Sequence, residues 1–222
     1  MESKQKSIAV VSGGLDSTTL LYYLVDKGED VTAVSFNYGQ THVVELEFAS
    51  YHTKKLGVKH TVINLKDVFK DISSSSALLG GIEMPTIQDV VGDPQPVTYV
   101  PFRNAILLTV AASVAEGIGA SKLYYGAQKH DEYSGYWDTT QVFTDSLQAM
   151  FNLNRKNKIT IEAPFVEKSK SDLVKIGTEL GLNYAKTMTC YSGTDCGICP
   201  TCADRIQAFK RAGLEDPKTY GR

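Results

Sequence analysis

Short apolar runs alternate with amphipathic helical patterns along nearly the whole chain, and this alternation restricts the fold more than any other feature. The first run, Ile8-Ala9-Val10-Val11, ends in a glycine-rich turn, after which a helical pattern places Leu20, Leu21 and Leu24 on one face. Strands are predicted at residues 8–11, 31–36, 61–63, 122–126 and 159–163, and helices around residues 18–27, 44–51, 106–114, 143–154, 173–180 and 200–212. This order is typical of an α/β protein with a doubly wound, mainly parallel, Rossmann-like sheet.

The length and composition of the chain predict one domain. Its 222 residues, of which 42% are hydrophobic, suffice for one sizeable core over residues 1–222, without an internal repeat or linker. Residues 73–96 combine four consecutive serines with glycines and prolines, so we expect a long surface loop. Such a loop is either a lid or a segment without function.

Charge and the N-terminal sequence restrict partners and compartment. A net charge of −2 and a pI near 6.1 lack the positive excess that polynucleotide binding requires, so we expect no stable nucleic-acid binding. The sequence begins without an apolar signal segment and has no run of about 18 apolar residues. We therefore predict a cytoplasmic protein without membrane contact.

The segment Ser12-Gly13-Gly14-Leu15-Asp16-Ser17 lies between the first strand and the first helix, at the sheet edge where such folds bind ligands. Glycines allow backbone N–H groups to approach an anion, the serine hydroxyls add donors, and the helix N-terminus adds its positive end. This predicts a cradle for pyrophosphate. Because a carboxylate does not attract phosphate, Asp16 is expected to cap the helix or to orient Mg²⁺.

All four cysteines lie near the C-terminus, at Cys190, Cys196, Cys199 and Cys202. The last three bring their thiolates into one tight turn, and Cys190 can complete a four-thiolate, structural zinc site. Redox chemistry and two disulfides are the alternatives, although a cytoplasmic chain keeps its thiols reduced. We predict a small zinc-binding helical segment at about residues 186–222 whose folding depends on the metal.

Cations and one polar loop are candidates for binding a charged substrate. Arg103 begins an otherwise apolar helix, and Lys168 and Lys170 lie at the start of another, where cations are unfavourable unless an anion is bound. A solvated helix start, or for Arg103 a surface salt bridge, is the alternative interpretation. The loop after the fourth strand suits stacking on a flat base and pairing with its N–H edge, or is an ordinary surface loop. Its candidate residues are His130, Asp131, Tyr133, Tyr136, Trp137 and Asp138.

The glycine-rich turn resembles the S-G-G-x-D-S signature of the ATP pyrophosphatase (PP-loop) superfamily. Other segments are similar to the 7-cyano-7-deazaguanine synthase family, in the same order along nearly the whole chain, which is more specific than any one motif. These segments are Phe36-Asn37-Tyr38-Gly39-Gln40 with Glu45, Val100-Pro101-Phe102-Arg103-Asn104, Ser134-Gly135-Tyr136, Lys168-Ser169-Lys170, Thr189-Cys190-Tyr191, the cysteine cluster and Gly213-Leu214-Glu215-Asp216-Pro217.

The resemblance implies an adenine nucleotide alpha hydrolase-like fold and an ATP-dependent ligase of queuosine biosynthesis. Its substrate would be 7-carboxy-7-deazaguanine, which is adenylated with loss of pyrophosphate and aminated by ammonia to an amide. A second activation at the amide oxygen and dehydration would then form the nitrile. The implied cofactors are ATP, Mg and Zn, and a homodimer is compatible with the family.

The resemblance also implies roles for particular residues. Catalysis is expected from Asp16, Arg103, Lys168 and Lys170, of which the cations supply charge for the departing pyrophosphate. Nucleotide binding is expected from Val11, Ser12, Gly13, Gly14, Leu15, Asp16, Ser17, Thr18, Thr19, Tyr38 and Gln40. Substrate binding is expected from Arg103, Asn104, His130, Asp131, Tyr133, Tyr136 and Asp138.

The chain departs from the family pattern at several positions. Trp137, Thr139 and Thr140 replace a proline, a cysteine and an arginine, Thr41 replaces an arginine, and Met188 replaces a tryptophan. These changes leave ATP activation and zinc binding intact but affect the acceptor. The enzyme could stop at the amide, use another carboxylate, or use an amine other than ammonia.

Two other functional classes are considered. A PP-loop tRNA-thiolating enzyme would use its cysteines as sulfur carriers and requires a basic surface, which the net charge does not supply. A zinc-ribbon interaction module would leave the glycine-rich turn without a role. His42 and His60 are interpreted as ordinary helix and strand-edge residues and His52 as a surface residue, so no function is assigned to them.

Overall fold

The computed structural model describes residues 5–90, 93, 96–129, 136–154 and 156–221. Within these ranges a five-stranded sheet has the order β3-β2-β1-β4-β5, and every neighbouring pair of strands is parallel. The strands are β1 (Lys6–Val10), β2 (Asp30–Asn37), β3 (Lys59–Asn64), β4 (Lys122–Tyr124) and β5 (Thr160–Glu162). The predicted doubly wound parallel sheet is confirmed.

Helices connect the strands. The α-helices are α1 (Leu15–Asp26), α2 (Glu45–Leu56), α3 (Lys66–Phe69), α4 (Ile87–Val90), α5 (Arg103–Ile118), α6 (Gln141–Phe151), α7 (Lys170–Glu179) and α8 (Pro200–Ala212). Short 3-10 turns are η1 (Lys70–Ser75), η2 (Ala77–Leu79), η3 (Trp137–Thr139) and η4 (Tyr184–Lys186). Among the described ranges, no helix combines the length and apolar character that crossing a membrane requires.

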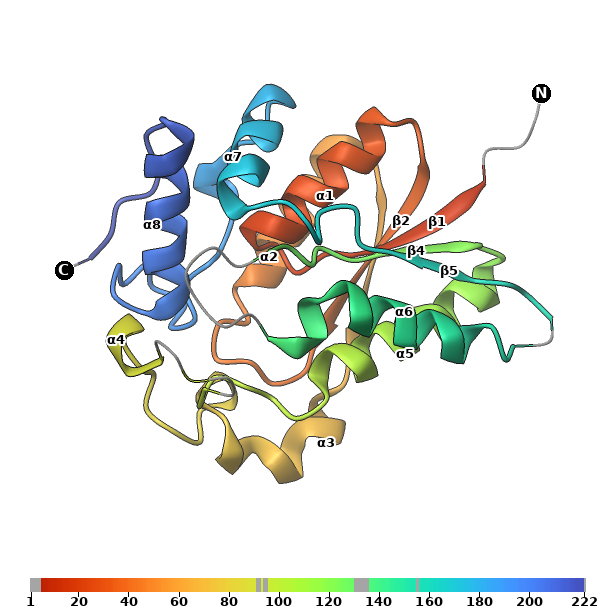
Figure 1. Cartoon of the computed structure of the whole chain (residues 1–222), viewed down its shortest axis with the longest axis horizontal. Coiled ribbons are helices and arrows are strands. Elements are labelled where there is room, and N and C mark those ends of the chain that lie inside the picture. The colour runs from red at the N-terminus through yellow and green to blue at the C-terminus, as the bar shows by residue number, and fades with distance from the viewer. Residues whose placement is uncertain (1–4, 91–92, 94–95, 130–135, 155, 222) are drawn as a thin grey trace.

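The sheet separates two hydrophobic cores. Figure 1 shows α1 and α7 on one face of the sheet and α5 and α6 on the other, with α8 outside α7. Because successive side chains of a strand point to opposite faces, Ile8 packs with the α5 and α6 core, while Ala9 packs with the α1 and α7 core. The strand order reverses between β1 and β4, and this switch point is where doubly wound folds bind their ligands.

Residues 73–96 differ from the predicted surface loop. The described part of this segment includes the end of η1, all of η2 and α4, and Ala77 and Leu78 are each only 1% exposed. Leu78 belongs to the same core cluster as Phe69 and Val100. Burial of this short apolar run ties the segment to the core beside the sheet, so the prediction of a surface loop is wrong at η2.

His52 also differs from its prediction as a surface residue. It is fully buried in α2, where its two ring nitrogens contact the Tyr22 hydroxyl at 3.0 Å and the Lys186 carbonyl at 2.8 Å. Its neighbour Tyr51 is 40% exposed. A polar histidine can occupy the buried face because the fold supplies a partner for each ring nitrogen.

Candidate functional site

The glycine-rich turn forms a closed loop between β1 and α1. The Ser12 N–H donates to Ser17 Oγ at 3.1 Å, the two serine hydroxyls lie 3.0 Å apart, and the Gly14 N–H donates to Ser12 Oγ at 3.2 Å. Gly14 precedes the first turn of α1 and gives it no side-chain cap. The first N–H groups of α1 therefore have no capping side chain, which is the arrangement that suits an anion.

A cavity of about 270 Å³ opens beside this loop, over the switch point of the sheet. Among its lining residues are ten that were predicted for the site: Val11, Ser12, Gly14, Leu15, Asp16, Ser17, Tyr38, Arg103, Asn104 and Lys170. Four other predicted nucleotide-binding residues, Gly13, Thr18, Thr19 and Gln40, are not among the lining residues. Thr19 instead joins the Leu15 carbonyl to the Tyr184 hydroxyl, and Gln40 contacts Glu45.

A second cavity of about 210 Å³ adjoins the first. The two share the lining residues Asp16, Arg103 and Lys170, together with Gly126, Thr139, Tyr191 and Thr201. The second cavity adds Tyr136, whose hydroxyl lies 2.6 Å from Thr98 Oγ1. The shared wall thus carries one carboxylate and two cations between two open spaces.

Lys170 is buried at this wall, with 5% exposure at the first residue of α7. Its ammonium lies 3.6 Å from Asp16 and 2.5 Å from Asp204. Burial lowers the pKa of Lys170, but the two carboxylates outweigh it and shift the pKa upward, so the group remains charged. Lys168, two residues earlier, is exposed and lines neither of these cavities.

Arg103 begins α5 and also lines both cavities. Its guanidinium donates to the Tyr38 hydroxyl at 3.4 Å and to Asn104 Oδ1 at 3.4 Å. Burial lowers the pKa of Arg103, but the surrounding tyrosines and Asp138 raise it by more. The net shift of the pKa is upward, so the charge of Arg103 is permanent. The site therefore holds two fixed positive charges next to the glycine-rich loop.

The predicted base-binding loop is described only in part, because His130, Asp131 and Tyr133 lie outside the described residues. Tyr136 lines the second cavity. Asp138 is 4% exposed, and its backbone carbonyl accepts from Asn104 Nδ2 at 3.5 Å. Burial raises the pKa of the Asp138 carboxyl, while Arg103 lowers it less. Asp138 is not among the lining residues of either cavity.

Glu45 and His42 line the first cavity, although neither was among the predicted site residues. Glu45 accepts from Gln40 Nε2 at 2.9 Å and lies 3.6 Å from His42 Nε2. Burial raises the pKa of Glu45 to about 7 and lowers the pKa of His42 to about 4. His42 is therefore neutral near neutral pH, whereas Glu45 changes between its neutral and charged forms in that range.

Glu45→Gln is expected to change how stability depends on pH. Because the folded chain holds the Glu45 proton more tightly than the unfolded chain, its stabilising contribution is present below pH 4.5 and is lost as the pH rises to about 7. As the pH rises between these values, the wild type should lose about 3 kcal/mol of unfolding free energy that the variant does not lose. Urea unfolding at several pH values, with the exposed Glu47→Gln as control, measures this. Parallel stability curves for Glu45→Gln and the wild type would contradict the expectation.

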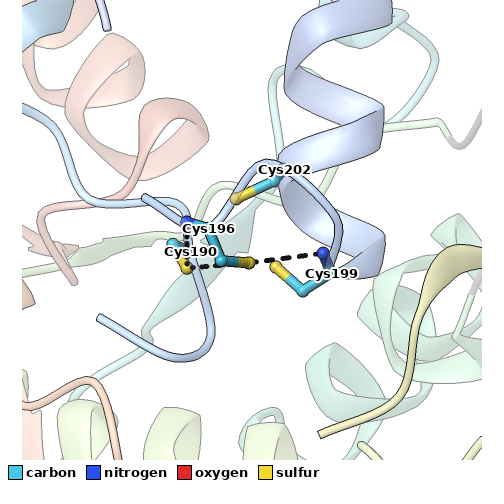
Figure 2. A group of neighbouring side chains, drawn as sticks. All are labelled: Cys190, Cys196, Cys199 and Cys202. Carbon is cyan, nitrogen blue, oxygen red and sulfur yellow. Dashed lines mark hydrogen bonds between the residues drawn. The ribbon is translucent and has the colours of Figure 1, made fainter. Parts of the chain in front are cut away.

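The four cysteines form one cluster next to the first turn of α8. Their sulfur atoms all lie within 4.8 Å of one another, and Figure 2 shows the four side chains gathered at the start of this helix. Cys190, Cys199 and Cys202 are buried, and Cys190 Sγ lies 3.6 Å from Cys196 Sγ. Backbone N–H groups of Cys196 and Cys199 point at sulfur atoms, each at 3.4 Å, as they do around metal-bound thiolates. This cluster can hold a metal ion.

Other residues of the cavity walls were missed by sequence reasoning. Tyr125, Thr189 and Thr201 line the first cavity, and Gln128 and Asp204 line the second. Thr189 belongs to the segment Thr189-Cys190-Tyr191, which carried part of the family resemblance but was not assigned a role in the site. Asp204 lies in a polar stretch of α8 without any motif, so no sequence signal could have identified it.

Comparison with known proteins identifies the family. The model of the queuosine biosynthesis protein QueC matches residues 6–213. The chain is 42% identical over 225 residues to a 7-cyano-7-deazaguanine synthase of Clostridium kluyveri, covering 97% of this chain and 98% of that protein. It is 40% identical to the protein of the same name from Archaeoglobus fulgidus, covering 96% of this chain and 89% of that protein.

Solved structures with low sequence identity share the fold. A U34-tRNA thiolase, NcsA, from Methanococcus maripaludis superimposes with a TM-score of 0.52 at 14% identity, covering 99% of this chain and 77% of that one. An NMN synthetase from Francisella tularensis gives a TM-score of 0.51 at 12% identity, covering 96% of this chain and 79% of that one. With a family model that spans almost all of the fold and relatives near 40% identity over most of their length, the chain belongs to the QueC family of queuosine biosynthesis proteins.

Proposed function

We propose that this protein is a 7-cyano-7-deazaguanine synthase that converts 7-carboxy-7-deazaguanine to the nitrile, using ATP and ammonia. The observation that carries the proposal is the anion cradle of the glycine-rich loop facing two cations, the half-buried Arg103 and the buried Lys170, in a chain of the QueC family. Adenylation of a carboxylate needs positive charge where pyrophosphate departs. It also needs an enclosed site that keeps water from the acyl adenylate.

The residues at the first cavity fit a nucleoside triphosphate. The open N–H groups at the start of α1 and the Ser12 and Ser17 hydroxyls suit the phosphates, and Lys170 and Arg103 stabilise the charge that develops on pyrophosphate. Asp16 supplies the carboxylate oxygen that Mg²⁺ prefers, with phosphate oxygens as its other ligands. A bound Mg²⁺ would neutralise phosphate charge.

The cysteine cluster fits zinc. Tetrahedral Zn–S bonds of about 2.3 Å place the sulfur atoms roughly 3.8 Å apart, close to the 3.6 Å between Cys190 and Cys196. Four thiolates leave no open position for water, so the ion would hold residues 186–222 against the rest of the chain and take no part in the reaction. We extend the proposal to a single catalytic domain over residues 1–222.

The second cavity is the proposed site of the deazaguanine acceptor. Tyr136 offers an aromatic face there. Asn104, which lines the adjoining first cavity, offers an amide and is held by the backbone carbonyl of Asp138. His130, Asp131 and Tyr133 remain candidates in the same loop, and Lys168 remains a candidate from outside the cavity. We further propose ammonia as the amine, a cytoplasmic location and a homodimer.

Product analysis tests this function. We expect purified protein incubated with ATP, Mg²⁺, 7-carboxy-7-deazaguanine and ammonium to form the nitrile, detected by mass spectrometry, while AMP and pyrophosphate are released for each activation. Omission of the deazaguanine carboxylate should abolish AMP release. An amide as the final product would show an enzyme that stops after one activation. Absence of substrate-dependent AMP would refute the assignment of the acceptor.

A further inference from the structure

Lys170 has two carboxylate partners that come from different parts of the chain. Asp16 belongs to the glycine-rich loop and lies 3.6 Å from the lysine ammonium, whereas Asp204 belongs to α8 and lies 2.5 Å away. Both contacts are shielded, because the Lys170 side chain is 6% exposed and the Asp204 side chain 16%. The shorter contact is therefore made by Asp204, which lies outside the glycine-rich loop.

The position of Asp204 is determined by its neighbour Arg205. Arg205 is 1% exposed and donates two hydrogen bonds of 2.9 Å to the Asp216 carboxylate. It also donates to the Tyr184 carbonyl at 2.9 Å and to the Thr187 hydroxyl at 2.7 Å. A buried bidentate arginine permits little rotation of its helix. Arg205 therefore holds α8 at the rotation that directs Asp204 to Lys170.

The cysteine cluster determines where α8 begins. Cys199 is the N-cap of α8 and Cys202 lies in its first turn, while Thr201 between them lines both cavities. Thr201 also donates to the Thr189 carbonyl at 2.8 Å, next to Cys190. The cluster, the first turn of α8 and Asp204 thus form one continuous support that ends at the Lys170 ammonium.

We propose that Asp204 is a positioning residue that holds the Lys170 ammonium at the wall shared by the two cavities. A buried lysine with Asp16 as its only counterion would follow Asp16 whenever that carboxylate engages nucleotide or its cation. Asp204 remains as an ion-pair partner outside the glycine-rich loop, 2.5 Å from the ammonium, so Lys170 stays at this wall while Asp16 is engaged. The inference rests on the proposed function for its consequence in catalysis, since Lys170 acts there on departing pyrophosphate.

Two readouts on Asp204→Asn test this inference. In the chain without nucleotide, labelling of lysine amines followed by mass spectrometry should show Lys170 reacting about tenfold faster, because loss of a close carboxylate lowers its pKa by about one unit. The exposed Lys175 on the same helix is the internal reference. In pyrophosphate release, kcat should fall about 10-fold to 100-fold while KM for ATP changes less than about threefold.

Matched variants separate positioning from folding. Asp204→Glu retains the carboxylate, so Lys170 should stay slow to label and kcat should recover at least in part. Glu179→Gln removes an exposed carboxylate from α7 and should match the wild type in both readouts. In a Lys170→Met background, Asp204→Asn should cause no additional loss of kcat, because its effect passes through the lysine. Should Asp204→Asn fail to fold, Asp204→Ser removes the same charge with a smaller side chain.

The outcomes distinguish this inference from the proposed function. A wild-type protein that releases no pyrophosphate with 7-carboxy-7-deazaguanine refutes the function, and amine labelling then decides on Asp204 by itself. Wild-type labelling of Lys170 in Asp204→Asn overturns the inference. The inference is also overturned if Asp204→Asn speeds the labelling of Lys170 but leaves kcat of an active enzyme unchanged. It is overturned as well if Asp204→Asn lowers kcat in the Lys170→Met background as much as it does in the wild-type background.

Discussion

Gly13→Ala is expected to prevent stable folding, the largest effect we expect from a single methyl group in this chain. A Cβ at this position would lie 2.0 Å from the Glu45 carbonyl oxygen and 2.8 Å from the Ala49 backbone nitrogen. Both atoms are helical backbone of α2, where Ala49 is fully buried, so neither can move aside alone. The backbone angle φ of +94° adds strain for any residue with a Cβ. The expected loss exceeds about 4 kcal/mol of unfolding free energy.

Gly57→Ala is the matched control for the backbone term. Gly57 also has a positive φ, of +66°, but a Cβ there would meet no atom within 4 Å. It should cost only about 1 kcal/mol. Urea unfolding of both variants, together with their soluble yield, separates the steric contact from the strain. A Gly13→Ala protein as stable as Gly57→Ala would show that α2 does not press against the glycine-rich loop.

Cys199→Ala is expected to abolish metal binding and to unfold the C-terminal segment. Cys199 is 1% exposed, and its loss leaves three thiolates without a fourth ligand at the N-terminus of α8. Because metal binding and folding of such segments are coupled, we expect a loss of at least about 4 kcal/mol in the free energy of unfolding. Elemental analysis should find no zinc. Hydrogen exchange should show loss of protection in α8 while β1 and β2 retain theirs.

Ile198→Ala is the control for this experiment, because it lies between two ligand positions and is 63% exposed. It should bind one metal ion per chain, as the wild type should, and exchange normally in α8. Full metal content in Cys199→Ala would refute a four-thiolate site. Normal protection in a metal-free variant would instead show that α8 folds through Arg205 and its partners without help from the cluster.

Much of the fold follows from local patterns. The order of strands and helices could be predicted because the apolar periodicity of each element is a local property, and parallel strands with helical crossovers leave few topologies. The boundaries of α8 were predicted at residues 200–212, since Pro200 and Gly213 mark its two ends. By contrast, α1 begins at Leu15, three residues before its prediction, because the loop is tight enough for Gly14 to serve as N-cap.

Burial of polar groups could not be predicted in this way. Lys168 and Lys170 have the same chemistry and lie two residues apart, yet Lys168 is exposed and Lys170 is buried, with 5% exposure. Glu45 in α2 was quoted only within a motif, but it lines the cavity with a pKa raised to about 7. For Lys170 the deciding factor is a partner from a distant segment, Asp204. For Glu45 it is burial by the tertiary fold, which raises the pKa although Gln40 and Arg103 lower it.

The sequence by itself thus determined the order of strands and helices, the glycine-rich turn and the four-cysteine motif, because each depends on residues close together in the chain. Only the tertiary structure decided that Lys170 is shared between Asp16 and Asp204, that His52 is buried, and that Lys168 lies outside the cavities. A local sequence pattern specifies whether a segment forms a helix or a strand and which of its faces is apolar. The cost of burying a charge or a polar ring is settled by partners tens of residues away, which only packing brings into contact.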